Sequence, residues 1–217
     1  MSKSTFNYEA LTPENAAILF IDHQTGLMTS LVNDISEGDL KNNVLALAKA
    51  AKIHKLPTIL TTSNHEGPNG PLMPELVKVY PDVKVIRRTG TINVWDYPEF
   101  VSAVKATKRK KLIMAGITTD VCVVFAALSA VSAGYDVYAV IDASGTYNQA
   151  VQNISIMRLA QAGVNVINWF AVAAELQADW RKSTGNEMAQ LFSEHLIRYG
   201  MIMTNWLANR PEQKVTQ

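Results

Sequence analysis

The sequence predicts a doubly wound α/β fold built on a mostly parallel, six-stranded sheet, with a helical C-terminal extension. Two observations support this prediction. Short runs rich in apolar and β-branched residues alternate along the chain with longer segments of helical periodicity, which is the order expected of strand–helix–strand units. The first run, Ala16-Ala17-Ile18-Leu19-Phe20-Ile21, is apolar at every position, as expected for a strand buried on both faces.

The remaining strands and their connecting helices follow in order along the chain. The strands are expected at 58–62, 83–86, 112–115, 136–141 and 164–167. Helices are expected at 40–54, 74–79, 97–107, 119–133 and 147–161, where apolar residues recur at helical spacing. Gly134 and Gly163 follow two of these helices, and glycine commonly occupies the position after a helix end.

The region from Ala178 onward falls outside this alternation. One face of a helix is marked there by Met188, Leu191, Phe192, His195, Leu196 and Tyr199. A second short helix is expected at 201–207. We therefore treat 1–217 as a single domain, with 178–217 as a helical extension. The extension either caps the sheet or contacts a neighbouring subunit.

Composition excludes several classes of protein. The formal net charge is +1 and a single cysteine is present, so neither a nucleic-acid-binding field nor a disulfide scaffold is expected. Residues 1–15 lack the apolar core of a signal peptide, and no apolar run reaches the roughly 20 residues of a membrane helix. We expect a soluble, cytoplasmic protein. Charged residues are only 18% of the chain, against about 25% in most proteins, which favours an oligomer.

An acid and the only thiol are expected to converge at one end of the sheet. In open α/β sheets, ligands bind beyond the carboxyl ends of the strands, where the strand order reverses. With the order 3-2-1-4-5-6, the first and fourth strands are neighbours at that point. Asp22 ends the first strand, and Cys122 lies in the turn after the fourth. The alternatives are that Cys122 is a small core residue and that Asp22 caps a local turn.

The sequence lacks the motifs of other enzyme classes that are built on this kind of sheet. The sequence contains no G-x-S-x-G, no G-x-G-x-x-G and no P-loop. Its four histidines are scattered, without the spacing of a metal-binding pair. These absences disfavour serine hydrolase, dinucleotide and nucleoside-triphosphate functions.

Three stretches carry a resemblance to a known family. Phe20–Gln24, Ala115–Val123 and Val140–Ala143 resemble the isochorismatase-like cysteine hydrolases. Further stretches resemble most closely the YcaC-like subgroup: Leu56–Ser63, Gly67–Pro71 and Gly90–Asp96. The resemblance spans about 15–181 and implies the isochorismatase-like hydrolase fold.

The family uses an Asp–Lys–Cys catalytic triad, which the resemblance carries over to Asp22 and Cys122. The place of the lysine is taken by Arg88, as in the YcaC-like subgroup. Arginine does not lose its proton, so it can stabilise charge but cannot shuttle a proton. Lys84 and Arg87 are the competitors for this role. Because the third strand does not adjoin the first, we expect the loop after Arg88 to reach across.

The resemblance also implies how the site is completed. It implies a cis peptide bond between Ile117 and Thr118, with the backbone N–H groups of Thr118 and Cys122 as the oxyanion hole. Gln24, Asn93 and Trp95 are expected to line the substrate pocket. Nicotinamidases of the superfamily bind a metal through a D-x-H element, but residues 63–66 read Ser-Asn-His-Glu. No metal and no other cofactor are therefore expected.

The leading hypothesis is a metal-free cysteine hydrolase that cleaves a small amide, or a related C–N or ester-like bond, through a thioester. A helix start and Arg88 should lower the pKa of Cys122, although a nearby Asp22 carboxylate opposes this effect. A non-catalytic binding protein and a thiol redox sensor remain open as alternatives. The resemblance also implies a closed homo-oligomer, such as an octamer of two tetrameric rings. The near-neutral charge of the chain predicts no nucleic-acid or membrane partner.

Overall fold

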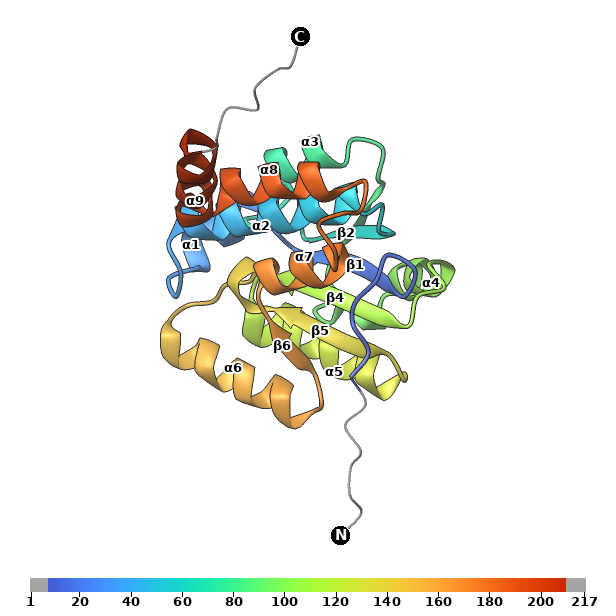
Figure 1. Cartoon of the computed structure of the whole chain (residues 1–217). Helices are drawn as coiled ribbons and strands as arrows, with labels where there is room; N and C mark the ends of the chain where they lie inside the picture. Colours follow the sequence, from blue (N-terminus) through green and yellow to red (C-terminus); the bar gives the residue numbers. More distant parts are fainter. Residues whose placement is uncertain (1–7, 210–217) are drawn as a thin grey trace.

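A computed structural model describes residues 8–209 of the chain. Its centre is a sheet of six parallel strands in the order β3-β2-β1-β4-β5-β6 (Figure 1). The strands are β1 (Ala16–Ile21), β2 (Thr58–Ser63), β3 (Val85–Arg88), β4 (Lys111–Gly116), β5 (Asp136–Val140) and β6 (Asn165–Ile167). The predicted α/β class and strand order are confirmed, and strand order reverses between β1 and β4.

Helices follow most of the strands. The α-helices are α1 (Thr25–Leu31), α2 (Glu37–Ile53), α3 (Pro74–Val79), α4 (Pro98–Ala106), α5 (Val124–Ser132), α6 (Gln149–Gln161), α7 (Trp169–Gln177), α8 (Gly185–His195) and α9 (Ile197–Ala208). Short turns of other helix types are η1 (Val94–Asp96), η2 (Thr119–Val123) and η3 (Ile141–Ala143). None of the helices within 8–209 is long and apolar enough to cross a membrane.

Two hydrophobic clusters sandwich the sheet. Strand β1 is buried at every position and alternates between them: Ile18 and Phe20 pack in one cluster, Leu19 and Ile21 in the other. Helices α2, α3, α7 and α8 cover the first face, while α4, α5 and α6 cover the second (Figure 1). Burial on both faces explains why the strand sequence is apolar without alternation.

Three local predictions need correction. Residues 25–31 form α1 and residues 169–177 form α7, two helices that were not expected from the sequence. The helix expected at 119–133 divides into a π-helical turn, η2, followed by α5. The third strand begins and ends two residues later than expected, so Arg88 belongs to β3 and does not follow it.

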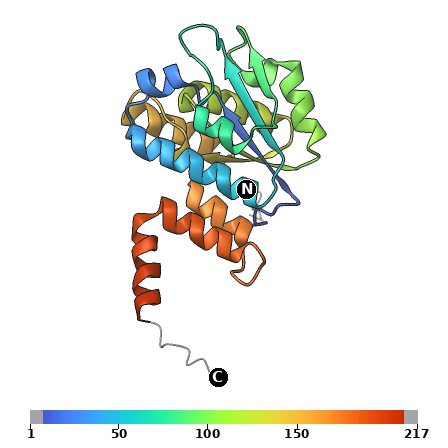
Figure 2. The ribbon, with the colours of Figure 1, turned by 90° about the horizontal axis from the view of Figure 1, so that it is seen from above.

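The C-terminal extension consists of two unlike helices. Helix α8 buries Met188, Leu191 and Phe192 in the core, where it packs against α2 and α7. Helix α9, in contrast, buries none of its residues. Viewed from above, it projects away from the body of the molecule (Figure 2). The extension therefore completes the core with its first half only.

Candidate active site

Asp22 follows β1 directly, at the carboxyl end of the sheet, and is fully buried. Its backbone has φ of +59°, a left-handed conformation that costs an ordinary residue about 1–2 kcal/mol and that aspartate adopts more readily than most. The Asp22 N–H donates to the carbonyl of Thr61 on β2 at 3.2 Å. The neighbouring strand thus holds the Asp22 backbone in this position.

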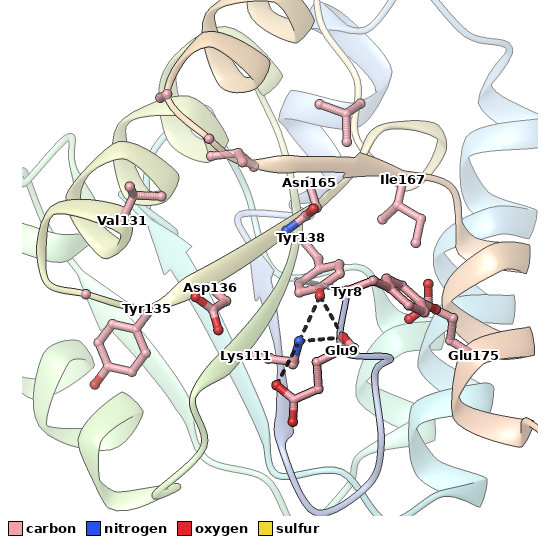
Figure 3. Close-up of a pocket in the computed structure, with 15 residues that line it drawn as sticks. Tyr8, Glu9, Lys111, Val131, Tyr135, Asp136, Tyr138, Asn165, Ile167 and Glu175 are labelled. Atoms are coloured by element: carbon pink, nitrogen blue, oxygen red, sulfur yellow. Dashed lines mark hydrogen bonds and ion pairs between the residues drawn. The ribbon is translucent and has the colours of Figure 1, made fainter. Parts of the chain in front are cut away.

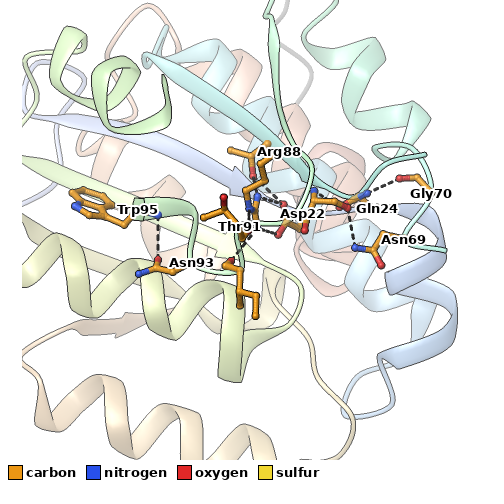
Figure 4. Close-up of polar contacts among 11 residues, drawn as sticks. Asp22, Gln24, Asn69, Gly70, Arg88, Thr91, Asn93 and Trp95 are labelled. Carbon is orange, nitrogen blue, oxygen red and sulfur yellow. Dashed lines mark hydrogen bonds and ion pairs between the residues drawn. The ribbon is translucent and has the colours of Figure 1, made fainter. Parts of the chain in front are cut away.

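Arg88 pairs with Asp22 inside the protein, and neither side chain is exposed. Its Nη1 donates to Asp22 Oδ1 at 2.8 Å, and its Nη2 donates to Asp22 Oδ2 (Figure 4). Nε donates to the Thr91 carbonyl at 2.7 Å, and Nη2 also donates to the Ile92 carbonyl at 3.4 Å. A buried charge needs such compensation, since desolvation costs several kcal/mol per ion.

Thr61, on the strand between β1 and β3, completes this network. Its hydroxyl accepts from Arg88 Nη1 at 3.2 Å and donates to Asp22 Oδ1 at 3.0 Å. All five guanidinium N–H groups of Arg88 therefore have an acceptor. Sequence reasoning missed Thr61; the available signal was its place near the end of β2, beside the end of β1.

Arg88 reaches Asp22 with its own side chain. Along β3, Arg87 is exposed and Arg88 is buried, as strand alternation predicts. The guanidinium spans β2, where Thr61 bridges it to Asp22. The expectation that the following loop must reach across is therefore wrong. Instead, that loop supplies two carbonyl oxygens that hold the guanidinium.

Cys122 lies in the π-helical turn η2, just before α5, and is partly exposed. It meets the Asp22 side chain through a hydrogen bond. Burial raises the pKa of the Cys122 thiol to about 12, and the charge and hydrogen bond of Asp22 contribute to the rise, whereas Arg88 opposes it. The expected depressed pKa is therefore wrong for the resting site, because desolvation and Asp22 outweigh the guanidinium.

The segment before Cys122 has the backbone that the resemblance implied. The peptide bond between Ile117 and Thr118 is cis. The Thr118 N–H donates a hydrogen bond to the Cys122 side chain, which favours the thiolate and opposes the rise in its pKa. Thr119 N–H is engaged elsewhere, donating to the Gly145 carbonyl at 3.0 Å. Thr118 thus presents a donor beside the sulfur, and its role as an oxyanion hole with Cys122 stays a prediction.

Gln24 is fully buried, and both ends of its amide hold the loop after β2. Oε1 accepts from the Ser63 N–H at 2.8 Å, and Nε2 donates to the Gly70 carbonyl at 2.5 Å (Figure 4). Contact of Gln24 with a substrate stays a prediction, but these bonds favour a role in positioning the loop.

Asn93 and Trp95 lie farther from the triad. The Asn93 side chain accepts from the Trp95 N–H at 3.1 Å and donates to the Ser129 hydroxyl at 3.0 Å, so it caps η1 and ties it to α5. The Trp95 ring packs edge-on against Phe100 and Tyr135. In Figure 4 it points away from Asp22 and Arg88. The structure therefore does not bring these two side chains to the reactive centre, and their contact with substrate stays a prediction.

Within residues 8–209, no three His, Cys, Asp or Glu side chains gather in a way that could hold a metal ion. His65, in the segment that corresponds to the family's metal-binding element, lies 3.7 Å from the carboxylate of its neighbour Glu66. Glu66 is itself exposed.

The amino ends of the strands form a different kind of site. A cavity of about 890 Å³ opens there beside β4, β5 and β6 (Figure 3). Lys111 is buried at its floor and donates to the Glu9 carbonyl at 2.6 Å and to the Tyr138 hydroxyl at 3.0 Å. None of the residues predicted to be functional lines this cavity.

Comparisons with known proteins agree with the geometry. The model of the isochorismatase domain family matches residues 16–170. A protein of Escherichia coli strain K12 named probable hydrolase YcaC is 52% identical over 199 residues, which are 92% of this chain and 95% of that protein.

Two solved structures are similar over almost the whole chain. The Escherichia coli YcaC structure, described as an octameric hydrolase of unknown specificity, has a TM-score of 0.91 and 50% identity, covering 95% of this chain and all of that one. YcaC from Pseudomonas aeruginosa, solved with hexane-2,5-diol and covalent acrylamide, has a TM-score of 0.89 and 49% identity, covering 93% of this chain and 99% of that one.

Proposed function

This chain belongs to the isochorismatase family of hydrolases, and we propose that it hydrolyses a small amide, or a related C–N or ester-like bond, through a thioester on Cys122. The observation that carries the proposal is the contact of Cys122 with a buried carboxylate that is itself paired with Arg88. A thiol beside an oriented base is the arrangement of an activated nucleophile.

Asp22 is the base in this proposal, and its free acceptor site is on Oδ2. A carboxylate offers about four lone-pair sites. Apart from the thiol, and within residues 8–209, Oδ1 accepts from Arg88 Nη1 and from Thr61, while Oδ2 accepts from Arg88 Nη2. One site on Oδ2 is therefore left for the thiol proton. With a thiol pKa of about 12, little thiolate forms spontaneously at neutral pH, so the proton must be taken during attack.

The steps of the reaction follow from these positions. Cys122 Sγ bonds to the substrate carbonyl carbon as its proton moves to Asp22. The oxyanion accepts from the N–H groups of Thr118 and Cys122; removing one such donor typically slows an enzyme about 10²–10³-fold. The C–N or C–O bond then breaks, and Asp22 returns the proton to the leaving amine or alcohol. Water attacks the thioester, Asp22 takes its proton, and the acid leaves as the thiol is restored.

Arg88 provides a fixed positive charge and moves no proton. Every N–H of its guanidinium is engaged by Asp22, Thr61 or the two loop carbonyls, so it has no donor left for a substrate. It orients the Asp22 carboxylate and offsets its charge in a buried site. The replacement of the family's lysine by arginine fits this role, since a planar guanidinium binds both oxygens of a carboxylate at once.

The covalent acrylamide on the Pseudomonas aeruginosa relative supports a nucleophile on this scaffold. Acrylamide is an electrophile that thiols attack. Cys122 is the only cysteine of this chain, and its partly exposed side chain can meet a small reagent.

The test is intact-protein mass spectrometry with a panel of small amides and esters. The unaltered chain should gain the mass of an acyl group, and Cys122→Ala should not. Asp22→Asn should slow turnover by about 10²–10⁴-fold. Asp120→Asn is the matched control, because this carboxylate lies in the same turn but accepts from Thr146; it should keep most of the turnover.

Two results would contradict the proposal. Absence of both adduct and turnover across the panel would favour a non-catalytic binding protein. Formation of a stable sulfenic acid on Cys122 with peroxide, without any acyl adduct, would favour a redox sensor.

We also propose that the protein is a homo-oligomer held in part by α9. The helix has twelve residues, buries none of them and carries one charged residue, Arg198. Isolated helices of this length are marginal in water, so α9 needs a neighbour to cover it. Its largely exposed apolar residues include Ile197, Met201, Ile202 and Leu207. The octameric state of the Escherichia coli relative supports the same assembly here.

Light scattering tests the assembly. A chain ending at Leu196 keeps α8 and its core residues but lacks α9. Its mass measured by light scattering should correspond to an assembly of fewer chains than that of the full chain. A second test is Ile202→Glu, which adds a charge to an exposed apolar residue of α9. Met157→Glu makes the same kind of change on the exposed face of α6 and is the matched control. A monomeric full chain, or an unchanged oligomer after removal of α9, would contradict the proposal.

A further inference from the structure

Thr61 lies between the two members of the buried ion pair, on the strand that separates them. Strand β2 runs between β1 and β3, and Thr61 stands in register with Ile21, the residue before Asp22. Its side chain is fully buried. Ile59, two residues earlier on β2, packs in the cluster that α4 and α5 cover. Because side chains two apart on a strand share a face, Thr61 faces the same side of the sheet.

The hydroxyl of Thr61 has both of its hydrogen-bonding roles fixed by its neighbours. A guanidinium can only donate hydrogen bonds, and an ionised carboxylate can only accept them. The Thr61 oxygen therefore accepts from Arg88 Nη1 at 3.2 Å, and its O–H donates to Asp22 Oδ1 at 3.0 Å. The backbone carbonyl of Thr61 accepts from the Asp22 N–H at 3.2 Å. One residue thus holds both the backbone and the carboxylate of Asp22.

The hydroxyl also makes the two carboxylate oxygens of Asp22 unequal. Arg88 donates to each of them, Nη1 to Oδ1 and Nη2 to Oδ2 (Figure 4). Thr61 adds a further donor to Oδ1 alone. An oxygen that already accepts two hydrogen bonds has little capacity for a third. The contact with Thr61 therefore directs an incoming proton to Oδ2.

We propose that Thr61 is a positioning residue, whose hydroxyl fixes the Asp22 carboxylate in the orientation that presents Oδ2 to the thiol of Cys122. This role rests on the proposed function, in which Asp22 is the base. A base must lie within hydrogen-bond reach of the proton that it takes, and small errors of alignment can slow a reaction about 10²-fold. Because Thr61 is fully buried, it acts through Asp22 and not by touching the substrate.

A purely structural role of the hydroxyl would affect the thiol in the opposite direction. If loss of the hydroxyl only loosened the site, Cys122 would become more exposed, and the burial that raises its pKa would weaken. In the positioning role, the O–H of Thr61 offsets part of the Asp22 charge, and that charge raises the pKa of Cys122. Loss of the hydroxyl should then raise the pKa of the thiol further and slow its alkylation.

The decisive variant is Thr61→Val, which keeps the shape of the side chain and removes the hydroxyl. On an amide or ester substrate, kcat should fall by about 10-fold to 100-fold, the usual effect of losing a hydrogen bond to a charged group. KM should stay within about twofold, because the lost contact does not bind substrate. Thr61→Ser keeps the hydroxyl and should restore most of kcat. Thr61→Ala also lacks the hydroxyl, should also lower kcat, and provides the measurement if Thr61→Val does not fold.

Thr62→Val is the matched control. Thr62 is the next residue of β2 and is also buried, at 2% exposed. Within residues 8–209, its hydroxyl has no hydrogen-bond partner. Successive side chains of a strand point to opposite faces of the sheet, so this hydroxyl faces away from Asp22. Its loss should change neither kcat nor the alkylation of Cys122.

Alkylation of Cys122 by iodoacetamide at pH 8 tests the same contact without a substrate. Intact-protein mass spectrometry follows the reaction, in which the sulfur displaces iodide from the reagent. Thr61→Val should react about twofold to fivefold more slowly than the unaltered chain, for a rise of less than one unit in the pKa of the thiol. Thr61→Ser and Thr62→Val should match the unaltered chain. In the Asp22→Asn background, Thr61→Val should have no further effect, because the carboxylate is gone.

The outcomes separate this proposal from the proposed hydrolysis. An unchanged kcat in Thr61→Val, a fall that Thr61→Ser does not reverse, or an equal fall in Thr62→Val would overturn the role of Thr61 and leave the hydrolysis standing. Faster or unchanged alkylation of Thr61→Val would show that the hydroxyl only stabilises the buried pair, and would also overturn it. If the unaltered chain turned over no amide or ester, the hydrolysis would fail, and with it any role of Thr61 in the reaction.

Discussion

Arg88 at the carboxyl ends of the strands and Lys111 at their amino ends are both almost completely buried, at 1% and 3% exposed. Their carboxylate partners differ. Asp22 has no exposed side-chain surface, whereas the Glu9 side chain is 67% exposed and lies 3.4 Å from the lysine. Water can solvate Glu9 when its partner is removed, whereas the buried charge of Asp22 depends on its hydrogen bonds from Arg88 and Thr61. Burial of the carboxylate therefore decides how much stability the protein loses when the cation is removed.

The largest effect should come from breaking the buried pair. Arg88→Met leaves Asp22 charged and buried, so we expect a loss of about 3–5 kcal/mol in the free energy of unfolding, measured by urea denaturation at fixed protein concentration. The double variant Arg88→Met with Asp22→Leu removes both charges and should recover most of the loss. If Arg88→Met were as stable as the unaltered chain, the Arg88–Asp22 pair would have to be far more exposed to water than it is in the structure.

His23 should give the reactive end a dependence on pH that the amino end lacks. It is fully buried, donates from Nε2 to the Ala143 carbonyl at 2.9 Å, and its pKa is lowered by burial to about 4. The unfolded chain, with a histidine pKa near 6.5, binds the proton first, so stability is lost as the pH falls from about 6.5 to 4.

Comparison with His23→Gln isolates this contribution, because Asp142 and all other groups are common to both chains. Between pH 7 and pH 4, the unaltered chain should lose about 3 kcal/mol more than the variant. Parallel curves of unfolding free energy against pH would show that His23 is protonated in the folded protein.

Asp22→Asn should separate the thiol's reactivity from catalysis. The Asp22 charge and hydrogen bond contribute to the high pKa of Cys122, and Arg88 opposes them. Without the carboxylate, the pKa of the thiol should fall, and alkylation by iodoacetamide at pH 8 should quicken by about 10-fold for each unit of that fall. Turnover should fall at the same time, because the base is missing. Slower alkylation in this variant would mean that Asp22 promotes thiolate formation even in the resting site.

The smallest effect should come from the amino end. Lys111→Met leaves Glu9 in contact with water, so we expect a loss of about 1 kcal/mol or less, with alkylation of Cys122 and turnover unchanged. A loss as large as that of Arg88→Met would remove the distinction between the two ends.

Much of the fold and of the site could be predicted from local sequence. The sequence of β1 is apolar at every position, which indicates a strand buried on both faces. The alternation of such runs with helical segments predicted the sheet. Asp22 and Cys122 could be placed together because each follows a strand, and strand order then brings both to one edge. The exposed Arg87 and buried Arg88 follow the two-residue period of a strand.

What depends on contacts between distant segments could not be predicted in this way. The sign of the pKa shift of Cys122 depends on the balance of desolvation, Asp22 and Arg88, and a helix start predicts only one contribution. The amide of Gln24 has the chemistry of a pocket residue, but tertiary structure directs it to Ser63 and Gly70.

The sequence by itself determined the fold class and the edge of the sheet at which chemistry is placed, because both follow from hydrophobic periodicity and the ends of strands. Tertiary structure alone decided that Thr61 joins Arg88 to Asp22 and that α8 enters the core while α9 stays outside. The physical reason is that hydrogen bonding and burial depend on the distances between side chains of different elements. A pattern along one element does not contain those distances.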